Sequence, residues 1–118
     1  MSVKTILVVE DEYFLADDCA SLAKKEGYKV AGPFGTLEEA RLGLEAVDGA
    51  IVDINLQGTF VYPLLDQLIE RNIPIVLYTG YDGYVVPERY SHLPAVIKPQ
   101  GCGDALQLLR QLIGQPTD

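Results

Sequence analysis

The sequence predicts one α/β domain, a doubly wound parallel sheet made of five consecutive β-α units. Apolar residues alternate between short continuous runs and stripes with helical spacing, and the connections between these segments are short. The chain has 118 residues, enough for one domain that buries a core without a disulfide or a metal ion. We therefore expect right-handed crossovers and helices on both faces of the sheet.

Five apolar segments predict the strands. The segment at 28–34 contains Pro33, which cannot donate a backbone hydrogen bond to a neighbouring strand, and this favours a place at the edge of the sheet. The others contain the short apolar runs that are typical of strands covered on both faces. The predicted strands are 5–9, 28–34, 50–54, 74–78 and 95–97.

Apolar stripes predict four helices between and after these strands. Thr36 and Glu39 have the spacing of a capping box, and Pro63 suits a first helical turn. The stretch from Thr79 to Pro94 carries no convincing stripe, so the fourth unit is expected to hold at most a short or irregular helix. The predicted helices are 13–26, 37–47, 63–69 and one from Gly103 or Asp104 to Ile113, and Gly27 caps the first.

The charge of the chain excludes several classes of partner. There are 9 Lys and Arg residues against 17 Asp and Glu residues, which gives a net charge of −8. Proteins that bind phosphate backbones carry clustered cations, so nucleic acid and anionic membranes are not expected as partners. The sequence contains neither a membrane-spanning apolar run nor the pattern of a signal peptide, so we expect a cytoplasmic protein.

The two cysteines are predicted to be small buried hydrophobic residues. Cys19 and Cys102 lie 83 positions apart and form no C-x-x-C pair. This spacing fits neither a disulfide framework nor a zinc site. We therefore expect no redox role for them.

Polar residues gather where the predicted strands end, which is where function lies in such sheets. Carboxylates that converge there repel one another and favour a divalent cation, and oxygen ligands select a hard ion such as Mg²⁺ or Mn²⁺. An Asp carboxylate can also attack phosphorus while a cation neutralises the phosphoryl oxygens. The residues are Glu10, Asp11 and Glu12 after the first strand, Asp53 and Asn55 after the third, Thr79 after the fourth and Lys98 after the fifth.

From end to end the chain resembles a response-regulator receiver domain. The motifs are V-V-E-D-E at 8–12, I-V-D-I-N at 51–55, Y-T-G at 78–80 and I-K-P at 97–99. The resemblance implies a flavodoxin-like (βα)5 sheet of order 2-1-3-4-5. It also implies that a sensor histidine kinase or a histidine phosphotransferase donates a phosphoryl group to the central Asp.

The resemblance assigns a role to each site residue. It makes Asp53 the phosphoacceptor and gives Asp11 and Asp53 as side-chain ligands of Mg²⁺ or Mn²⁺. Glu10 assists the metal through water, and Asn55 contributes its backbone carbonyl. Thr79 is the implied switch hydroxyl, and Lys98 is the implied phosphate-contacting cation.

Two finer features concern the fourth and fifth strands. The stretch L-Y-T-G-Y resembles a sub-group of stand-alone receivers with an F-x-T-G-Y-like strand, often paired with kinases of the HWE or a related type. Ala95 stands where receivers usually carry Phe or Tyr, so the usual coupling between hydroxyl and aromatic ring cannot operate through it. The residues that could substitute are Tyr78, Tyr81 and Tyr90, and the sequence does not choose among them.

The favoured function is therefore a phosphorylated signalling module that acts by binding another protein, and not a turnover enzyme. We expect a single receiver domain over 1–118 with no output domain, so that output passes through a downstream protein. One alternative is a receiver that binds its partner constitutively. Another is a phosphatase using an aspartyl phosphate, although such enzymes carry a D-x-D nucleophile motif after the first strand, where this chain has E-D-E.

The irregular segment gives a first testable prediction. Backbone amides between Thr79 and Pro94 should exchange with solvent faster than those of the helical segments, because this stretch lacks an apolar stripe that would bury it. Hydrogen exchange followed by mass spectrometry measures this difference. Uniformly strong protection across the segment would show the interpretation to be wrong.

Overall fold

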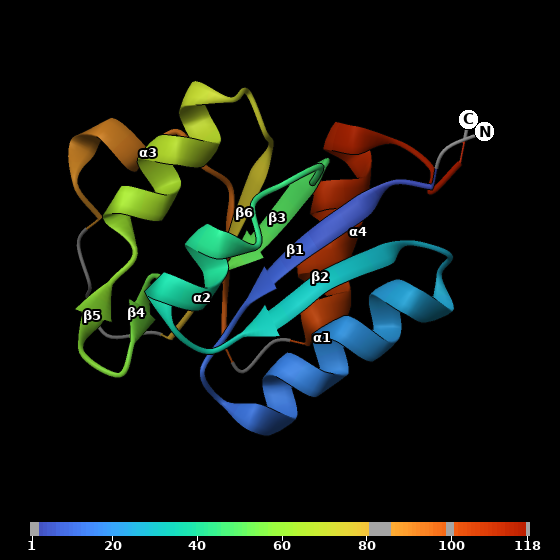
Figure 1. Cartoon of the computed structure of the whole chain (residues 1–118), viewed down its shortest axis with the longest axis horizontal. Helices are drawn as coiled ribbons and strands as arrows, with labels where there is room; N and C mark the ends of the chain where they lie inside the picture. The colour runs from blue at the N-terminus through green and yellow to red at the C-terminus, as the bar shows by residue number, and fades with distance from the viewer. Residues whose placement is uncertain (1–2, 81–85, 99–100, 118) are drawn as a thin grey trace.

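The five predicted strands form one parallel sheet in the computed structural model, which describes residues 3–80, 86–98 and 101–117 (Figure 1). The strand order is β2-β1-β3-β6-β7, which confirms the expected order 2-1-3-4-5 and places the strand that contains Pro33 at an edge. The strands are β1 (Thr5–Val9), β2 (Lys29–Phe34), β3 (Gly49–Val52), β6 (Ile75–Thr79) and β7 (Ala95–Ile97).

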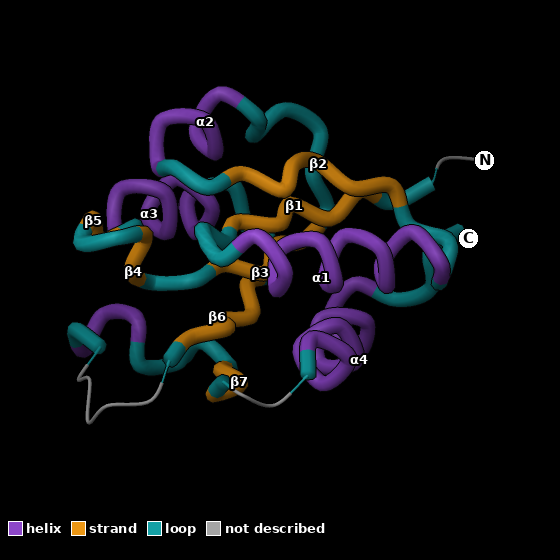
Figure 2. The backbone as a smooth tube through the Cα atoms, turned by 90° about the horizontal axis from the view of Figure 1, so that it is seen from below, coloured by secondary structure: helices purple, strands orange, loops and turns teal. Residues whose placement is uncertain are grey.

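Helices cover both faces of this sheet, as predicted (Figure 2). Helices α1 (Tyr13–Lys25) and α4 (Cys102–Ile113) lie side by side on one face. The other face carries α2 (Leu37–Leu42), α3 (Tyr62–Glu70) and the 3₁₀ turn η1 (Glu88–Tyr90). Within the described residues no helix is long and apolar enough to cross a membrane.

The alternation of side chains along β1 shows how the two layers are built. Ile6 and Val8 point into the core beneath α1 and α4, whereas Leu7 and Val9 point into the core beneath α2 and α3. All four side chains are buried. The strand is therefore apolar throughout because it is covered on both sides.

The predicted caps of two helices are confirmed, and the predicted length of one helix is wrong. The hydroxyl of Thr36 accepts a hydrogen bond of 3.2 Å from the backbone N–H of Glu39, which begins α2. Gly27 follows α1 with a φ of 103°, a conformation that glycine adopts without strain. The predicted second helix is too long, because α2 ends at Leu42 and the buried Leu44 and Val47 reach the core from outside the helix.

A short antiparallel hairpin follows the third strand, where the sequence predicted only a loop. Its strands are β4 (Asn55–Leu56) and β5 (Thr59–Phe60), joined by Gln57 and Gly58 with φ values of 52° and 94°. Two central residues with positive φ are typical of the tight turns that close hairpins. Two-residue strands are too short to show a periodicity, so the pattern of apolar residues could not reveal them.

The fourth unit holds only the three-residue turn η1 among its described residues, in agreement with the predicted short or irregular helix. Tyr90 anchors this turn because its ring is buried in the core beneath α3. Its hydroxyl donates a 2.6 Å hydrogen bond to Oδ1 of Asp66 in α3. Tyr81 lies outside the described residues.

The prediction for the cysteines is wrong in one respect. Both side chains are buried, as expected, but Cys19 of α1 and Cys102 of α4 are joined by a disulfide. Their Cα atoms lie 5.4 Å apart, within the range that a disulfide spans. The packing of α1 against α4 brings the cysteines together across 83 positions, which their spacing in the sequence could not show.

The two ends of the described chain lie together, away from the carboxyl ends of the strands (Figure 1). Val3 and Thr117 form an isolated antiparallel bridge. The backbone N–H of Lys4 donates a hydrogen bond of 2.8 Å to the carbonyl of Pro116. The molecule therefore carries its termini at one end and its strand-end loops at the other.

The anchoring of η1 can be tested with two substitutions at one position. We expect Tyr90→Phe to lower the free energy of unfolding by about 1 kcal/mol, since it removes only the hydroxyl, which donates to Asp66 and lies 3.3 Å from the backbone carbonyl of Tyr62. Tyr90→Ala should cost about 3–5 kcal/mol, because it also leaves a cavity where the buried ring packs. Urea unfolding of both variants measures the difference, and equal losses would contradict the role given to the ring.

Candidate functional site

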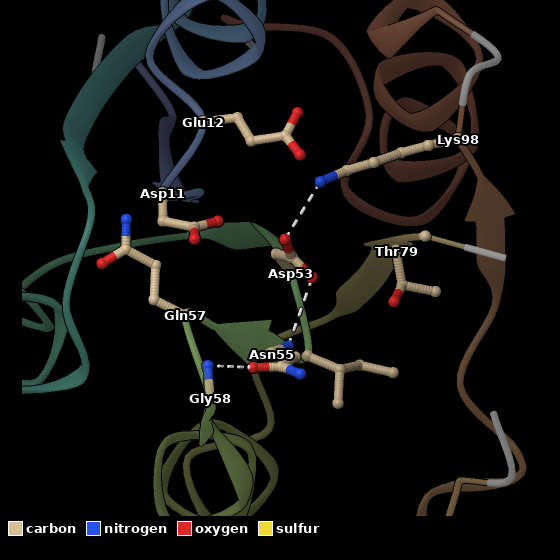
Figure 3. A pocket seen from close by; sticks show the side chains of 10 residues that line it. Asp11, Glu12, Asp53, Asn55, Gln57, Gly58, Thr79 and Lys98 are labelled. Atoms are coloured by element: carbon tan, nitrogen blue, oxygen red, sulfur yellow. Dashed lines mark hydrogen bonds and ion pairs between the residues drawn. The ribbon is translucent and has the colours of Figure 1, made fainter. Parts of the chain in front are cut away.

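A pocket lies at the carboxyl ends of the central strands, where the sequence predicts the functional residues (Figure 3). Backbone hydrogen bonds just beyond the strands bring its residues together. The N–H of Asp53 donates to the carbonyl of Val9, and the N–H of Lys98 donates to the carbonyl of Thr79. The residues that line the pocket are Asp11, Glu12, Asp53, Ile54, Asn55, Gln57, Gly58, Thr79, Gly80 and Lys98.

Three carboxylates meet at this pocket. Each of Glu10, Asp11 and Asp53 offers an oxygen atom, and these oxygens lie within 4.8 Å of one another. Glu10 and Asp53 are buried, with 4% and 5% of their surface exposed. Buried carboxylates at this separation repel each other unless positive charge lies close to them.

Lys98 supplies positive charge from the neighbouring strand end. Its Nζ lies 3.0 Å from Oδ2 of Asp53, to which it donates a hydrogen bond, and 2.8 Å from Oε1 of Glu10. The same ammonium lies 5.6 Å from the centre of the Tyr78 ring, in cation–π geometry. One cation is therefore shared by two buried anions.

Backbone donors fix the orientation of the carboxylates. The N–H of Glu12 donates to Oε2 of Glu10 at 3.0 Å, and the N–H of Asn55 donates to Oδ1 of Asp53 at 3.2 Å. The Asn55 side chain accepts a 2.6 Å hydrogen bond from the N–H of Gly58, which ties the hairpin to the site. Asp53 therefore has one oxygen held by the backbone and the other by Lys98.

Burial and charge shift two pKa values in the site. Burial raises the pKa of Glu10 from 4.5 to about 7, and the Lys98 ammonium offsets only part of this effect. Burial alone would lower the pKa of Lys98, but its hydrogen bonds and attraction to Glu10 and Asp53 outweigh burial and raise it. Lys98 is therefore fully charged at neutral pH.

The donor set fits a magnesium ion. Glu10 Oε1 is buried and pairs with the Lys98 ammonium at 2.8 Å, and a carboxylate oxygen has a second lone pair with which it can accept a water of a bound ion. Asp11 is only half-buried, and its carboxylate lies beside Asp53 at the mouth of the pocket (Figure 3). Mg²⁺ binds one or two carboxylates directly and keeps several waters, which matches this arrangement.

Thr79 lies in the pocket, whereas the tyrosines that could replace the missing aromatic residue are buried in the two cores. Thr79 lines the pocket on the side of Asp53 away from Asp11 (Figure 3). Ala95 is exposed on β7 and offers no ring. Of the described candidates for the missing aromatic residue, Tyr78 is buried between the sheet and the α1–α4 layer, and Tyr90 is buried on the opposite face.

The structure brings together the seven polar residues predicted at the strand ends, and Ile54, Gln57, Gly58 and Gly80 also line the pocket. Glu12 lies at the rim with an exposed side chain. Gln57 and Gly58 of the hairpin turn also line the pocket, and the sequence analysis missed both as site residues. Both residues reach the acidic cluster because the hairpin turns back toward it, and the hairpin was not predicted.

Curated proteins that resemble this chain in sequence include sensory transduction proteins. The sensory transduction protein RegX3 of Mycobacterium tuberculosis is 33% identical over 122 aligned positions, which cover 97% of this chain. The match covers 52% of RegX3, so the chain spans about half the length of the curated relatives that it matches. No family model matches the chain.

Solved structures that resemble this chain include signalling proteins of similar length. SdrG from Sphingomonas melonis is 30% identical, with a TM-score of 0.79 and coverage of 95% of this chain and 98% of SdrG. A CheY-like receiver domain from Methanospirillum hungatei, at 23% identity and a TM-score of 0.78, shares the fold. These proteins define the class as receiver domains of two-component signalling. The chain belongs to this CheY-like response-regulator receiver family.

The raised pKa of Glu10 predicts how stability depends on pH without divalent cations. Between pH 4.5 and about 7 the folded protein keeps the Glu10 proton that the unfolded chain releases, so the free energy of unfolding falls as pH rises. We expect a loss of about 2 kcal/mol from this residue between about pH 5 and about pH 8.

The matched variant is Glu10→Gln, which keeps the shape of the side chain and cannot titrate. Urea unfolding of both proteins at the two pH values gives the contribution of Glu10 as a difference. The same pH dependence in both proteins would contradict the prediction.

Proposed function

We propose that this chain accepts a phosphoryl group on Asp53 from the phosphohistidine of a kinase or phosphotransferase, in a reaction that needs Mg²⁺. The observation that carries the proposal is the convergence of Glu10, Asp11 and Asp53 with Lys98 at the strand ends. Its relatives support it, since SdrG, at 31% identity, has a BeF3-activated conformation, and beryllofluoride resembles a bound phosphoryl group.

The chain's own residues have distinct tasks in this reaction. A carboxylate oxygen of Asp53 attacks phosphorus as the P–N bond of the donor breaks, and the imidazole of the donor keeps the bond's electron pair. The N–H of Asn55 already holds the Asp53 carboxylate in one orientation. The Lys98 ammonium, which pairs with Asp53 before transfer, then pairs with the oxygens of the phosphoryl group. Thr79 donates a hydrogen bond to one of these oxygens.

The metal would be held by Asp11 and Asp53, by Glu10 through water and by the backbone carbonyl of Asn55. When bound, Mg²⁺ supplies the positive charge that lets a phosphoryl group approach three carboxylates. Lys98 alone cannot do so, because it already balances two buried anions. This is the physical reason to expect a strict requirement for a divalent cation.

Phosphorylation would alter binding to a downstream protein or pass the phosphoryl group onward, and turnover of a small substrate is not part of the proposal. The L-Y-T-G-Y stretch supports a donor of the HWE or a related type. The compartment that we propose for this chain is the cytoplasm. Because the relatives are about twice as long, the partners proposed here concern the receiver domain alone.

The phosphoacceptor can be identified by intact mass spectrometry. Incubation with Mg²⁺ and phosphoramidate should add one phosphoryl group to the wild type and none to Asp53→Asn, because the amide cannot attack phosphorus. The matched control is Asp17→Asn, which neutralises an exposed acidic residue of α1 and should react like the wild type.

Two further conditions define the roles of the cations. Lys98→Ala should slow the reaction by about 100-fold, as expected for the loss of one charged group aimed at the transferring phosphoryl group. Chelation with EDTA should abolish it. An adduct on Asp53→Asn, or no adduct on the wild type with any donor, would overturn the proposed function.

A further inference from the structure

The disulfide between Cys19 and Cys102 connects the two helices that leave the functional site. Helix α1 starts directly after Glu12, and Cys19 lies about two turns into it. Cys102 is the first residue of α4 and follows Lys98 by four positions. One covalent bond therefore joins the segment that carries the acidic pair to the segment that carries the site's cation.

The two helices are held together differently along their length. At the end near the site the link is the disulfide between Cys19 and Cys102. At the far end Arg110 of α4 pairs with Glu26 at a distance of 2.8 Å. Between them lies an apolar seam that contains Ala23, Ala105, Leu106 and Leu109.

This division gives the disulfide a local effect. If it is cut, the apolar seam and the Arg110–Glu26 pair still hold the far part of α4 against the sheet. Only the first turn of α4, next to the Lys98 segment, loses its covalent attachment to α1. The change should therefore loosen the position of Lys98 without unfolding the domain.

The chemistry of the two sulfur atoms suits reversible exchange. Cys102 is the more exposed residue, at 8% against 1% for Cys19, and we assign its sulfur as the one that a thiolate attacks. As the first residue of a 12-residue helix it also lies where the helix dipole stabilises a thiolate. Disulfides in reducing compartments are usually transient and regulatory, and the cytoplasm proposed above is such a compartment.

We propose that Cys19 and Cys102 form a reversible thiol–disulfide site, and that its oxidised form holds the Lys98 segment in place and thereby speeds phosphoryl transfer to Asp53. The reactant is a protein or small-molecule dithiol. This inference rests on the proposed function for its effect on phosphorylation, although the exchange reaction is independent of that function.

The reaction balances as a two-electron exchange. A thiolate of the dithiol attacks Sγ of Cys102, the Cys19–Cys102 bond breaks, and Cys19 Sγ takes the electron pair and then a proton. The second thiol of the reductant displaces Sγ of Cys102, which takes another proton. The chain gains two electrons and two protons, and the reductant leaves as its own disulfide.

The exchange is tested by treating the folded wild-type protein, removing the reagent and counting free thiols in denaturant, because both cysteines are buried in the fold. Maleimide labelling should find none in the air-oxidised protein and both cysteines after dithiothreitol, with the circular dichroism of the folded protein unchanged. Oxidised dithiothreitol should then reverse the change. Free thiols in the air-oxidised protein, or loss of the folded signal on reduction, would overturn the proposal.

The effect on phosphorylation is tested with phosphoramidate and Mg²⁺, which need no kinase. The reduced wild type should accept the phosphoryl group about fivefold more slowly than the oxidised one, a typical small coupling between two sites. The double variant C19S/C102S should react at the reduced rate whether or not dithiothreitol is present. Equal rates for the two wild-type forms would overturn the coupling.

Two further comparisons distinguish a failure of the proposed function from a failure of the thiol–disulfide proposal. In Asp53→Asn the thiol count should change with dithiothreitol as in the wild type, although no phosphoryl group is accepted. If neither redox form of the wild type is phosphorylated, the proposed function and the coupling both fail, whereas the thiol count still decides the exchange site. If the double variant does not fold, the two wild-type forms alone decide the coupling.

Discussion

The structure of the site depends on one ammonium group shared by two buried carboxylates. Lys98 lies within 3.0 Å of both Glu10 and Asp53, and both acidic side chains are almost fully buried. Without a cation between them, two such charges would cost several kcal/mol to bury. The parallel sheet meets this requirement, because its strands end at one edge and bring Glu10, Asp53 and Lys98 together although they lie far apart in the sequence.

The fold and the site could be predicted to the extent that they depend on local pattern. Apolar runs predicted four of the five strands, the segment with Pro33 predicted the edge strand, and the polar residues after four of the strands predicted the site. Features that arise only on packing escaped the prediction. The end of α2 at Leu42 and the disulfide depend on neighbours distant in the sequence, and the hairpin at Gln57 has strands of two residues, too short to show a periodicity.

The two faces of the sheet carry different features that lie close to the site. The α1–α4 face carries the disulfide and Tyr78, whose ring lies under the Lys98 ammonium. The other face holds η1 through Tyr90 and Asp66. With Ala95 exposed on β7, no aromatic ring at that position can respond to the pocket, and the described rings nearest to that role, Tyr78 and Tyr90, lie on opposite faces of the sheet.

The pairing of Val3 with Thr117 has a consequence for how the domain can be combined with others. Because both ends leave from the edge remote from the pocket, a neighbouring module fused to either end, or to both, would stand clear of an approaching phosphodonor (Figure 1). Nearby termini also permit insertion into a loop of a host protein and circular permutation with little disturbance of the sheet. The end at which other domains could be joined to this one is therefore remote from the pocket that holds Asp53.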